Sequence, residues 1–511
     1  MVKKKKQRTV LHPVIAFIIL ILGTILLSGI MGFFGVSEDY NTVNTIRGDL
    51  NTTTVIVNSL LNLSGVKMIF RTTVSNFASF APLINMIIVL IGIGIMDKSG
   101  FFEAFFTLLT KKASKLKVTF VLSLITVVAS IMGDLSYIIF LPICARCFKY
   151  GKRNPKAGII MAFAGLTCGT GINLFLSSID ASLIGYTEAA AVSLDATYTI
   201  NNLAFVFIMI IMTIIAAIIV TVITEKVIVP KMGKYEVPEE QEEFYLDKKK
   251  KKGLALSLTA GIIYILIFVY NIIPGLPFSG NLLDYSQELY IDKLFGYNSF
   301  FNQGFVFVVT LFFFICGLFY GIGAGTIKNN QDVSTYLGHS LDNVGKSLVI
   351  LFFASTFISI FKATNIGTIV VAFIGKFITS TGFTGIPLII VGFLASAVAT
   401  IFLPSPVTCW SILSGVMVPV FMNAGMTAEF AQLVFRAGEC ITYGLTPIMA
   451  YFAVYLAILD KNSETEKPTS LIQSITDILP YAGAMTLVWI TILIVLYIIG
   501  LPFGIGTNAI L

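Results

Sequence analysis

The sequence predicts an all-α membrane protein with nine transmembrane helices and two re-entrant hairpins, arranged as an inverted-topology repeat. Three features support this fold class: the composition, the distribution of Lys and Arg, and two similar broken apolar segments. Of the 511 residues, 56% are hydrophobic and 12% are charged, whereas soluble domains carry roughly 45–50% and ~25%. So few charges cannot cover a soluble globule of this length, which excludes a soluble enzyme, a nucleic-acid-binding protein and a disordered chain.

Long apolar runs without Lys, Arg, Asp or Glu, such as 10–36 and 203–222, mark the membrane segments. A spanning helix needs about 20 such residues. The strands of a β-barrel instead alternate apolar and polar residues over ~10 positions, so a barrel is excluded. A basic cluster at 3–8 precedes the first run, as in a signal peptide. That run is far longer than the roughly 7–15 apolar residues of a signal peptide, so we expect a retained first helix.

The positions of Lys and Arg predict the topology. Most of the 34 Lys and Arg residues lie in four short stretches, 3–8, 98–117, 146–156 and 226–252. Basic loops stay in the cytoplasm, so we expect these four inside the cell, with the N-terminus inside and the C-terminus outside the plasma membrane. The expected spans are 10–36, 79–97, 157–190, 200–225, 254–273, 301–324, 341–362, 429–457 and 481–502.

Two apolar segments are expected to enter and leave the membrane on the same side. The first, about 118–145, begins and ends in basic sequence, is too short for two spans, and has Gly133 and Asp134 in its middle. The second, about 384–421, is broken at the Pro-Ser-Pro stretch 404–406. A re-entrant hairpin is tolerated only where protein or a water-filled cavity covers its turn.

The two hairpin regions resemble each other. Each has an arm of small residues, a break, an aromatic residue (Tyr137 or Trp410) and an apolar arm that ends near a proline, and the following helices also match at 163–171 and 436–444. Because the charge rule opens the hairpins on opposite sides, the pattern predicts an inverted repeat, in which transporters hold substrates where broken helices meet. The alternative is two unrelated kinked helix pairs. The two halves and the cytoplasmic linker between them are 1–225, 253–511 and 226–252.

Ionisable side chains inside the spans are the candidates for chemistry, because such a group at the bilayer centre costs at least ~2.5–3.5 kcal/mol. Asp180 is expected to carry a proton or cation, or else to cap a helix near the outer surface. Asp134 has the same choice between ion coupling and capping, at the turn of its hairpin. Lys362 is expected to snorkel to the outer surface.

Arg436 and Glu439 lie three residues apart on one helix face. They form either a self-neutralising pair or a site where Arg436 forks onto a substrate carboxylate while Glu439 titrates. Trp410 follows the second break and either stacks on an aromatic substrate or packs in the core. Polar residues near the breaks complete the predicted coordination of substrate and ions: Asn173, Asn365, Ser405 and Thr408.

No metal or other cofactor is expected beyond H⁺ or Na⁺ as a coupling ion. The six cysteines fall in or beside apolar segments, where they act as small hydrophobes. The two histidines, His12 and His339, are far apart in the sequence and suggest no metal cluster. The motifs H-E-x-x-H and G-x-S-x-G and a phosphate-binding loop are missing, so we expect neither an intramembrane enzyme nor an ATP-driven pump.

Four blocks are characteristic in combination. They are F-A-P-L with G-I-G-I-M-D-K-S-G inside 77–100, N-L-F-L-S-S-I-D at 173–180, and the segments 365–368 and 430–436. These blocks resemble the p-aminobenzoyl-glutamate transporter (AbgT) family of the ion-transporter superfamily, and the likeness extends from about residue 11 to residue 501.

The resemblance implies a homodimer whose protomers each have nine transmembrane helices, two re-entrant hairpins and an inverted repeat. Members of the family are associated with uptake of the folate catabolite p-aminobenzoyl-glutamate, and some with export of sulfonamides. At the family's functional positions this chain has Asp180, Trp410, Arg436 and Pro447, and it has Glu439 where the family has Asp.

The second hairpin departs from the family pattern. Pro404 and Pro406 are gained, and Val407 replaces a usual Ser. Ala428 replaces a usual Pro, and the usual N-x-x-S-P is Y-G-L-T-P at 443–447. Because the hairpin tip is expected to touch the substrate, these changes leave the identity of the substrate open.

The sequence thus predicts a secondary transporter of p-aminobenzoyl-glutamate or a related aromatic or acidic anion, coupled to H⁺ or Na⁺. Its expected partners are a small-molecule substrate, the lipid bilayer and a second copy of the chain, and no nucleic acid. An exporter of sulfonamide-type antimetabolite drugs on the same scaffold is the alternative. An ion channel is a further alternative, which saturable counterflow would distinguish from a carrier.

Overall fold

The computed structural model describes residues 11–43, 50–172, 174, 177–233, 235, 245–288, 290–296, 298–342, 344–462 and 469–511. Within these residues, eleven helices are long and apolar enough to cross a membrane. The predicted class, an all-α protein that crosses the membrane repeatedly, is confirmed. Three of the eleven helices are arms of the two predicted hairpins. The count of nine spans, the division into two halves and their inverted relation stay predictions.

The chain begins with α1 (Pro13–Phe33), which has a proline at its first position, where the missing N–H would have no partner in the helix. An antiparallel strand pair follows, β1 (Ser37–Val43) and β2 (Leu50–Ile56), in register from Ser37 opposite Ile56 to Val43 opposite Leu50. The loop predicted at 37–66 therefore contains a β-hairpin, whose Thr and Val residues favour extended backbone.

Two helices occupy the place of the span predicted at 79–97. α2 (Leu63–Ala78) and α3 (Ala81–Lys98) are nearly continuous and are separated only by two residues ahead of Pro82. The prediction missed α2 because Lys67 and Arg71 interrupt its apolar pattern. A short amphipathic helix, α4 (Phe101–Lys112), follows the turn at the end of α3.

The first hairpin has the predicted form. Its arms are α5 (Lys115–Ala129) and α6 (Leu135–Tyr150), joined through the 3-10 turn η1 (Ser130–Met132). Gly133 has a φ of 60° and a ψ of −139°, a conformation open to glycine because it has no Cβ. The chain therefore turns where the sequence predicted the break.

The span predicted at 157–190 is two helices, α7 (Pro155–Gly169) and α8 (Ser178–Val192). A Cβ added at Gly169 would lie 2.7 Å from the carbonyl oxygen of Val127, and one at Gly171 would lie 2.7 Å from that of Arg436. The glycines are therefore required for close backbone packing around the break. The first half ends with α9 (Val206–Ile223), the π-helical turn η2 (Thr224–Ile228) and α10 (Val229–Met232).

The second half contains the other predicted break and three helices that the sequence did not predict. A break at 403–405 separates the hairpin arms α18 and α19, and the span predicted at 429–457 is interrupted by the turn η3. The short α13, the amphipathic α15 and the apolar α17 were not predicted. The elements are α12 (Lys248–Ile272), α13 (Tyr290–Phe295), α14 (Phe300–Ala324), α15 (Asn330–His339), α16 (Val344–Ala363), α17 (Ile366–Thr381), α18 (Gly385–Phe402), α19 (Pro406–Asn423), α20 (Ala428–Thr442), η3 (Tyr443–Leu445), α21 (Ala450–Lys461) and α22 (Leu471–Ile499).

The two halves build their centres in the same way. Both arms of each hairpin contact the first part of the broken helix that follows, α5 and α6 on α7, and α18 and α19 on α20. Every residue of α20 is buried. Its charged residues Glu429, Arg436 and Glu439 therefore lie in the protein interior and not on a lipid face.

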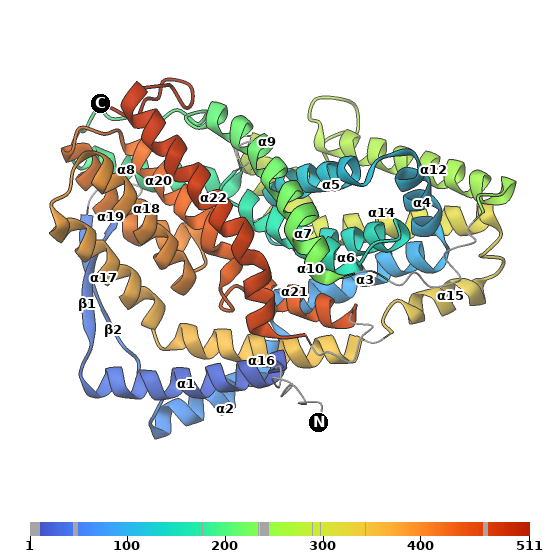
Figure 1. The fold of residues 1–511 in the computed structure, drawn as a ribbon, viewed down its shortest axis with the longest axis horizontal. Helices are drawn as coiled ribbons and strands as arrows, with labels where there is room; N and C mark the ends of the chain where they lie inside the picture. The colour runs from blue at the N-terminus through green and yellow to red at the C-terminus, as the bar shows by residue number, and fades with distance from the viewer. Residues whose placement is uncertain are drawn as a thin grey trace, which may run out of the picture.

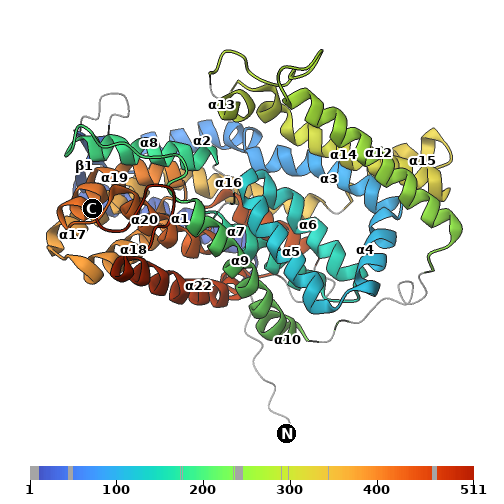
Figure 2. The ribbon, with the colours of Figure 1, turned by 90° about the horizontal axis from the view of Figure 1, so that it is seen from above.

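Long helices flank this centre on two sides (Figures 1 and 2). α1 and α16 run side by side along one edge, and α3, α12 and α14 form a separate group. α9 and α22 cross the molecule obliquely in front of the buried helices (Figure 1). The outer helices thus enclose the place where the broken segments meet.

Candidate functional site

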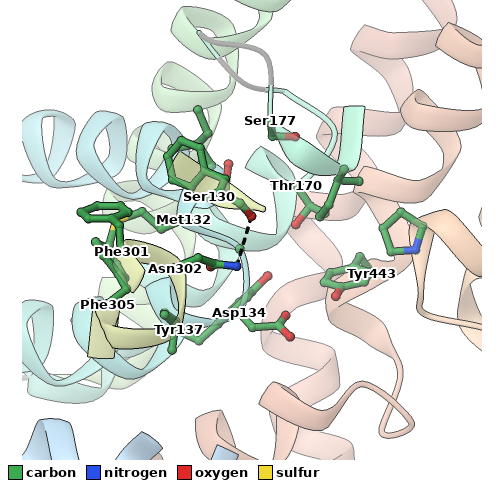
Figure 3. A pocket seen from close by; sticks show the side chains of 16 residues that line it. Ser130, Met132, Asp134, Tyr137, Thr170, Ser177, Phe301, Asn302, Phe305 and Tyr443 are labelled. Carbon is green, nitrogen blue, oxygen red and sulfur yellow. Dashed lines mark hydrogen bonds between the residues drawn. The ribbon is translucent and has the colours of Figure 1, made fainter. Parts of the chain in front are cut away.

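A central cavity of about 380 Å³ lies where the breaks converge. The turn of the first hairpin forms one wall, the break between α7 and α8 another, and the first turns of α14 a third (Figure 3). Pro406, at the tip of the second hairpin, and Tyr443, at the break after α20, complete the lining. The breaks of both hairpins, the break between α7 and α8 and the break after α20 therefore meet at one place.

Asp134 points into this cavity. It stands at the N-cap position of α6, but its side chain makes no capping hydrogen bond. Its side chain is exposed to the cavity, and Figure 3 shows the carboxylate near Tyr137 and Tyr443. Of the two interpretations of Asp134, capping is therefore not the one that the structure shows.

Arg436, Asp180 and Glu439 form a buried charged cluster that joins the two halves. The guanidinium of Arg436 donates through Nη1 to Oε2 of Glu439 at 2.7 Å, and through Nη2 to Oδ1 of Asp180 at 2.9 Å. Nη2 also donates to the backbone oxygen of Thr170 at 2.7 Å. Arg436 is 1% exposed, so this cluster is closed off from lipid and from bulk water.

Asp180 also caps α8. Its Oδ2 accepts hydrogen bonds from the hydroxyl of Ser177 at 2.5 Å and from the backbone N–H of Ser177 at 3.2 Å, while the N–H of Asp180 donates to that hydroxyl. The predicted cap is therefore real, but it lies in the protein interior and not at the outer surface. Ser177 and Thr170 both line the central cavity, so the cluster lies directly behind its wall.

The charges of this cluster do not balance by themselves. Two carboxylates share one guanidinium, and both Oε1 of Glu439 and Nε of Arg436 are buried without a hydrogen-bond partner among the residues that the structure describes. Buried polar atoms are nearly always hydrogen-bonded, and a buried charge without a partner is strongly disfavoured. The arrangement is therefore suited to take up a proton or a cation beside Glu439.

Trp410 packs inside the protein and does not line the central cavity. Its indole N–H donates to the hydroxyl of Thr187 at 2.9 Å, and its ring lies 4.7 Å from that of Phe435. Thr187 in turn donates to Gln432 at 2.6 Å. Of the two interpretations of Trp410, the geometry matches packing between α19, α8 and α20. Stacking of Trp410 on an aromatic substrate stays a prediction.

Three further predicted site residues lie near the breaks, and a fourth is not described. Ser405 and Thr408 share a hydrogen bond of 2.9 Å on either side of Pro406, at the hairpin tip. Pro447 is half-buried and follows the turn η3. Asn173 lies outside the described residues.

Asn365 and Lys362 are not part of the cavity lining. Asn365 stands at the N-cap position of α17 with a φ of 60°, and its side chain makes no capping hydrogen bond. The side chain instead donates to the backbone oxygen of Ile56 at 3.2 Å, so it connects the β-hairpin to α17. The structure thus places Asn365 at a structural junction and not at the cavity where an ion-coupling residue was expected. Lys362 is exposed and is close enough to Asp134 for their charges to interact. Its snorkelling to the outer surface stays a prediction.

The prediction missed the aromatic residues that α14 contributes to the cavity. Phe301, Asn302 and Phe305 line it together with Phe295 from α13. The only sequence signal was an Asn-Gln pair at 302–303 in an otherwise apolar helix start. Phenylalanines in a membrane helix are too common to mark a site before the fold is known.

Comparisons with known proteins give one consistent result. A family model described as the AbgT putative transporter family matches residues 4–511. The p-aminobenzoyl-glutamate transport protein of Escherichia coli (strain K12) is 26% identical over 495 residues, which cover 97% of this chain and 94% of that protein.

Two solved structures are similar in sequence over almost the whole chain. The YdaH transporter of Alcanivorax borkumensis, described as having an unusual topology, is 25% identical with a TM-score of 0.48 and covers 97% of this chain and 100% of its own. MtrF of Neisseria gonorrhoeae, described in connection with a class of antimetabolite efflux pumps, is 29% identical with a TM-score of 0.49 and covers 98% of each chain.

Proposed function

Because the chain belongs to the AbgT family of transporters, we propose that it moves p-aminobenzoyl-glutamate, or a related aromatic or acidic anion, by secondary active transport coupled to H⁺ or Na⁺. The match to a p-aminobenzoyl-glutamate transport protein along nearly the whole chain supports this substrate class. The observation that carries the proposal is the central cavity, where both hairpin tips and both broken helices meet. We also propose a homodimer in the plasma membrane, with the N-terminus in the cytoplasm and the C-terminus outside.

The lining of the cavity suits a molecule with an aromatic ring and carboxylates. Its volume of about 380 Å³ is in the range of roughly 300–1,000 Å³ that is usual for small-molecule sites. Phe301, Phe305 and Tyr443 offer rings for edge or face contacts. The amide of Asn302 and the hydroxyl groups in the wall offer polar contacts for the amide and carboxylates of p-aminobenzoyl-glutamate.

Asp134 supplies a physical reason for coupling. An anionic substrate in the same cavity is repelled by an ionised Asp134, because the surrounding protein screens charges less than water does. A proton or Na⁺ at Asp134 removes this repulsion. Each ligand then raises the affinity of the other by the same factor, as linkage requires.

The cluster of Asp180, Arg436 and Glu439 is the second proposed coupling site. One carboxylate balances Arg436, and a proton or cation balances the other. When the cation binds or leaves, Arg436 is free to change its pairing, and Thr170 and Ser177 transmit that change to the cavity wall. A guanidinium released from Glu439 is also available to pair with a substrate carboxylate.

Transport into proteoliposomes tests the proposal. We expect labelled p-aminobenzoyl-glutamate to accumulate when a pH or Na⁺ gradient is imposed, and Asp180→Asn to abolish accumulation while the protein stays folded. Saturable counterflow is expected for a carrier, and its absence would indicate a channel. Gradient-driven movement of a sulfonamide without any movement of p-aminobenzoyl-glutamate would replace the proposed substrate with the antimetabolite alternative.

A further inference from the structure

A second cavity, of about 340 Å³, lies away from the central one and shares no lining residue with it. It is formed by the end of α4, the start of α5, the end of α6 and the turn that leads into α7. Two of the basic stretches in the sequence, 98–117 and 146–156, supply its walls. We call it the basic cavity.

Among the described residues, the lining of the basic cavity has four cationic side chains and no Asp or Glu. They are Lys111, Lys115, Lys152 and Arg153. The three lysines are exposed, and none of them forms a salt bridge with any residue that the structure describes. Three unpaired positive charges around one cavity repel one another, and an anion among them removes that repulsion.

Arg153 fixes the base of this cavity. Its guanidinium donates to Oε1 of Glu225 at 2.5 Å and to the hydroxyl of Thr119 at 2.8 Å, and it lies 4.2 Å from the ring centroid of Phe148. Arg153 is therefore held in place and neutralised by Glu225. The three lysines around it form no such ion pair with a described residue and are available to bind an anion.

The backbone at Lys152 is strained. Its φ is 57°, in the left-handed region that residues with a Cβ rarely occupy. Glycine or asparagine would fit this turn with less strain. Such outliers cluster at ligand clamps, and here the strained residue is one that directs a charge to the cavity.

The surroundings of the cavity indicate where its anion comes from. Leu108 and Leu109 on α4, and Leu116, Val121 and Ile125 on α5, are apolar residues with exposed side chains on the same two helices as Lys111 and Lys115. In a membrane these side chains face acyl chains, so the lysines lie at the level of lipid headgroups. Basic pockets between membrane helices are known sites for anionic headgroups.

We propose that the basic cavity binds a phosphate-bearing anion, the headgroup of an acidic phospholipid whose chains lie along α5. The headgroup bridges α4 to the base of the first hairpin. Its charge offsets the repulsion among Lys111, Lys115 and Lys152. This inference does not depend on the transported substrate.

Native mass spectrometry of the whole purified protein tests the site. The probes are phosphatidylglycerol, phosphatidylcholine and inorganic phosphate, each titrated separately. The test variant combines Lys111→Gln, Lys115→Gln and Lys152→Asn, in which Asn tolerates the left-handed turn. The matched control removes three lysines that do not line the cavity, by Lys248→Gln, Lys249→Gln and Lys251→Gln.

We expect the wild type and the control to bind phosphatidylglycerol more tightly than phosphatidylcholine. The test variant is expected to lose on the order of fivefold in affinity for phosphatidylglycerol per lysine removed. Equal binding of phosphatidylglycerol by the test variant and the wild type, or equal loss in the control, would overturn the site. Inorganic phosphate that binds as tightly as the lipid would overturn the lipid as the source of the anion.

Discussion

Arg436 holds two buried carboxylates in place, so the stability of the centre depends on this one residue. Arg436→Leu leaves Asp180 and Glu439 buried without their cation. Removing one partner of a buried ion pair is expected to cost about 3–5 kcal/mol. The unfolding transition of the detergent-solubilised variant should therefore move well below that of the wild type.

A combined variant separates lost charge from lost packing. Asp180→Asn and Glu439→Gln, added to Arg436→Leu, remove the whole charged cluster and should recover most of the lost stability, because neutral replacement of buried ions is often tolerated. If Arg436→Leu alone is as stable as the wild type, the cluster does not stabilise the fold.

Asp134 is expected to link substrate binding to an ion. In the wild type, the affinity for an anionic substrate should rise as the pH falls, by up to about tenfold per pH unit, if a proton is the coupled ion. If Na⁺ is coupled, affinity should instead rise with Na⁺. Asp134→Asn should bind the substrate with a weaker dependence, because only the cluster of Asp180, Arg436 and Glu439 is then left to couple. Isothermal titration at several pH values and Na⁺ concentrations measures the difference.

Asp195 provides the matched control for Asp134. It is exposed in the loop after α8, and hydrogen bonds from the hydroxyl and backbone N–H of Thr197 lower its pKa. Asp195→Asn should leave the ion dependence of binding unchanged. A weaker dependence in both variants, or in neither, would speak against Asp134 as the linked group.

Trp410 and Phe301 are expected to behave differently. Trp410→Ala removes a buried ring between three helices, which should cost about 3–5 kcal/mol of stability. It should lower the binding affinity for aromatic and non-aromatic substrates by the same factor. Phe301→Ala removes a ring from the cavity wall and should lower the binding affinity for aromatic substrates more than that for aliphatic dicarboxylates. Binding assays with both substrate types, beside thermal unfolding, test the pair; the reverse pattern would restore Trp410 as the stacking residue.

At the scale of elements, the turn of the first hairpin depends on Gly133. Its φ of 60° and ψ of −139° make any Cβ costly, by about 1–3 kcal/mol. Gly133→Ala should therefore destabilise the hairpin and misplace Asp134, lowering transport more than protein yield. Thermal unfolding and uptake by proteoliposomes measure the two effects.

Gly23 is the control for Gly133. It lies inside α1, and a Cβ added there meets no atom within 4 Å. Gly23→Ala should be neutral or stabilising by about 0.5–1 kcal/mol, because alanine favours a helix. Equal losses in the two variants would mean that the turn geometry of Gly133 is not the cause.

At the scale of the molecule, segments that the charge rule assigns to one side lie together. The C-terminal residues 500–511 connect two loops that are both expected outside: Ile505 donates to the backbone oxygen of Leu203, and Leu511 donates to that of Gly425. On the other side, two of the four basic stretches expected inside, 98–117 and 146–156, meet at the basic cavity. Which side of the membrane each of these loops faces stays a prediction.

Cysteine labelling tests this topology directly. The six native cysteines are buried, so an introduced cysteine on the surface should react selectively. An impermeant maleimide added to intact cells should label Thr53→Cys in β2 and spare Lys249→Cys at the start of α12. Labelling of Lys249→Cys from outside, with the membrane intact, would reverse the assigned orientation.

The sequence predicted most of the long helices and both hairpin breaks, because apolar length and glycine or proline breaks are local properties. It did not predict the β-hairpin, α2, α4, α13, α15 or α17. Their signals are weak: Lys67 and Arg71 interrupt α2, and the strands are short and polar. Only packing against neighbouring elements makes such segments stable, and a single sequence does not display its neighbours.

The sequence by itself determined that the protein is built for a membrane, where it breaks its helices, and which ionisable residues a bilayer would not tolerate without a purpose. The tertiary structure decided which of these residues meet. Asp180 and Arg436 are 256 positions apart and form an ion pair, whereas Asn365 lies at a junction with β2. The physical reason is that the cost of a buried charge can be read from one residue, but its partner is chosen by the packing of distant helices.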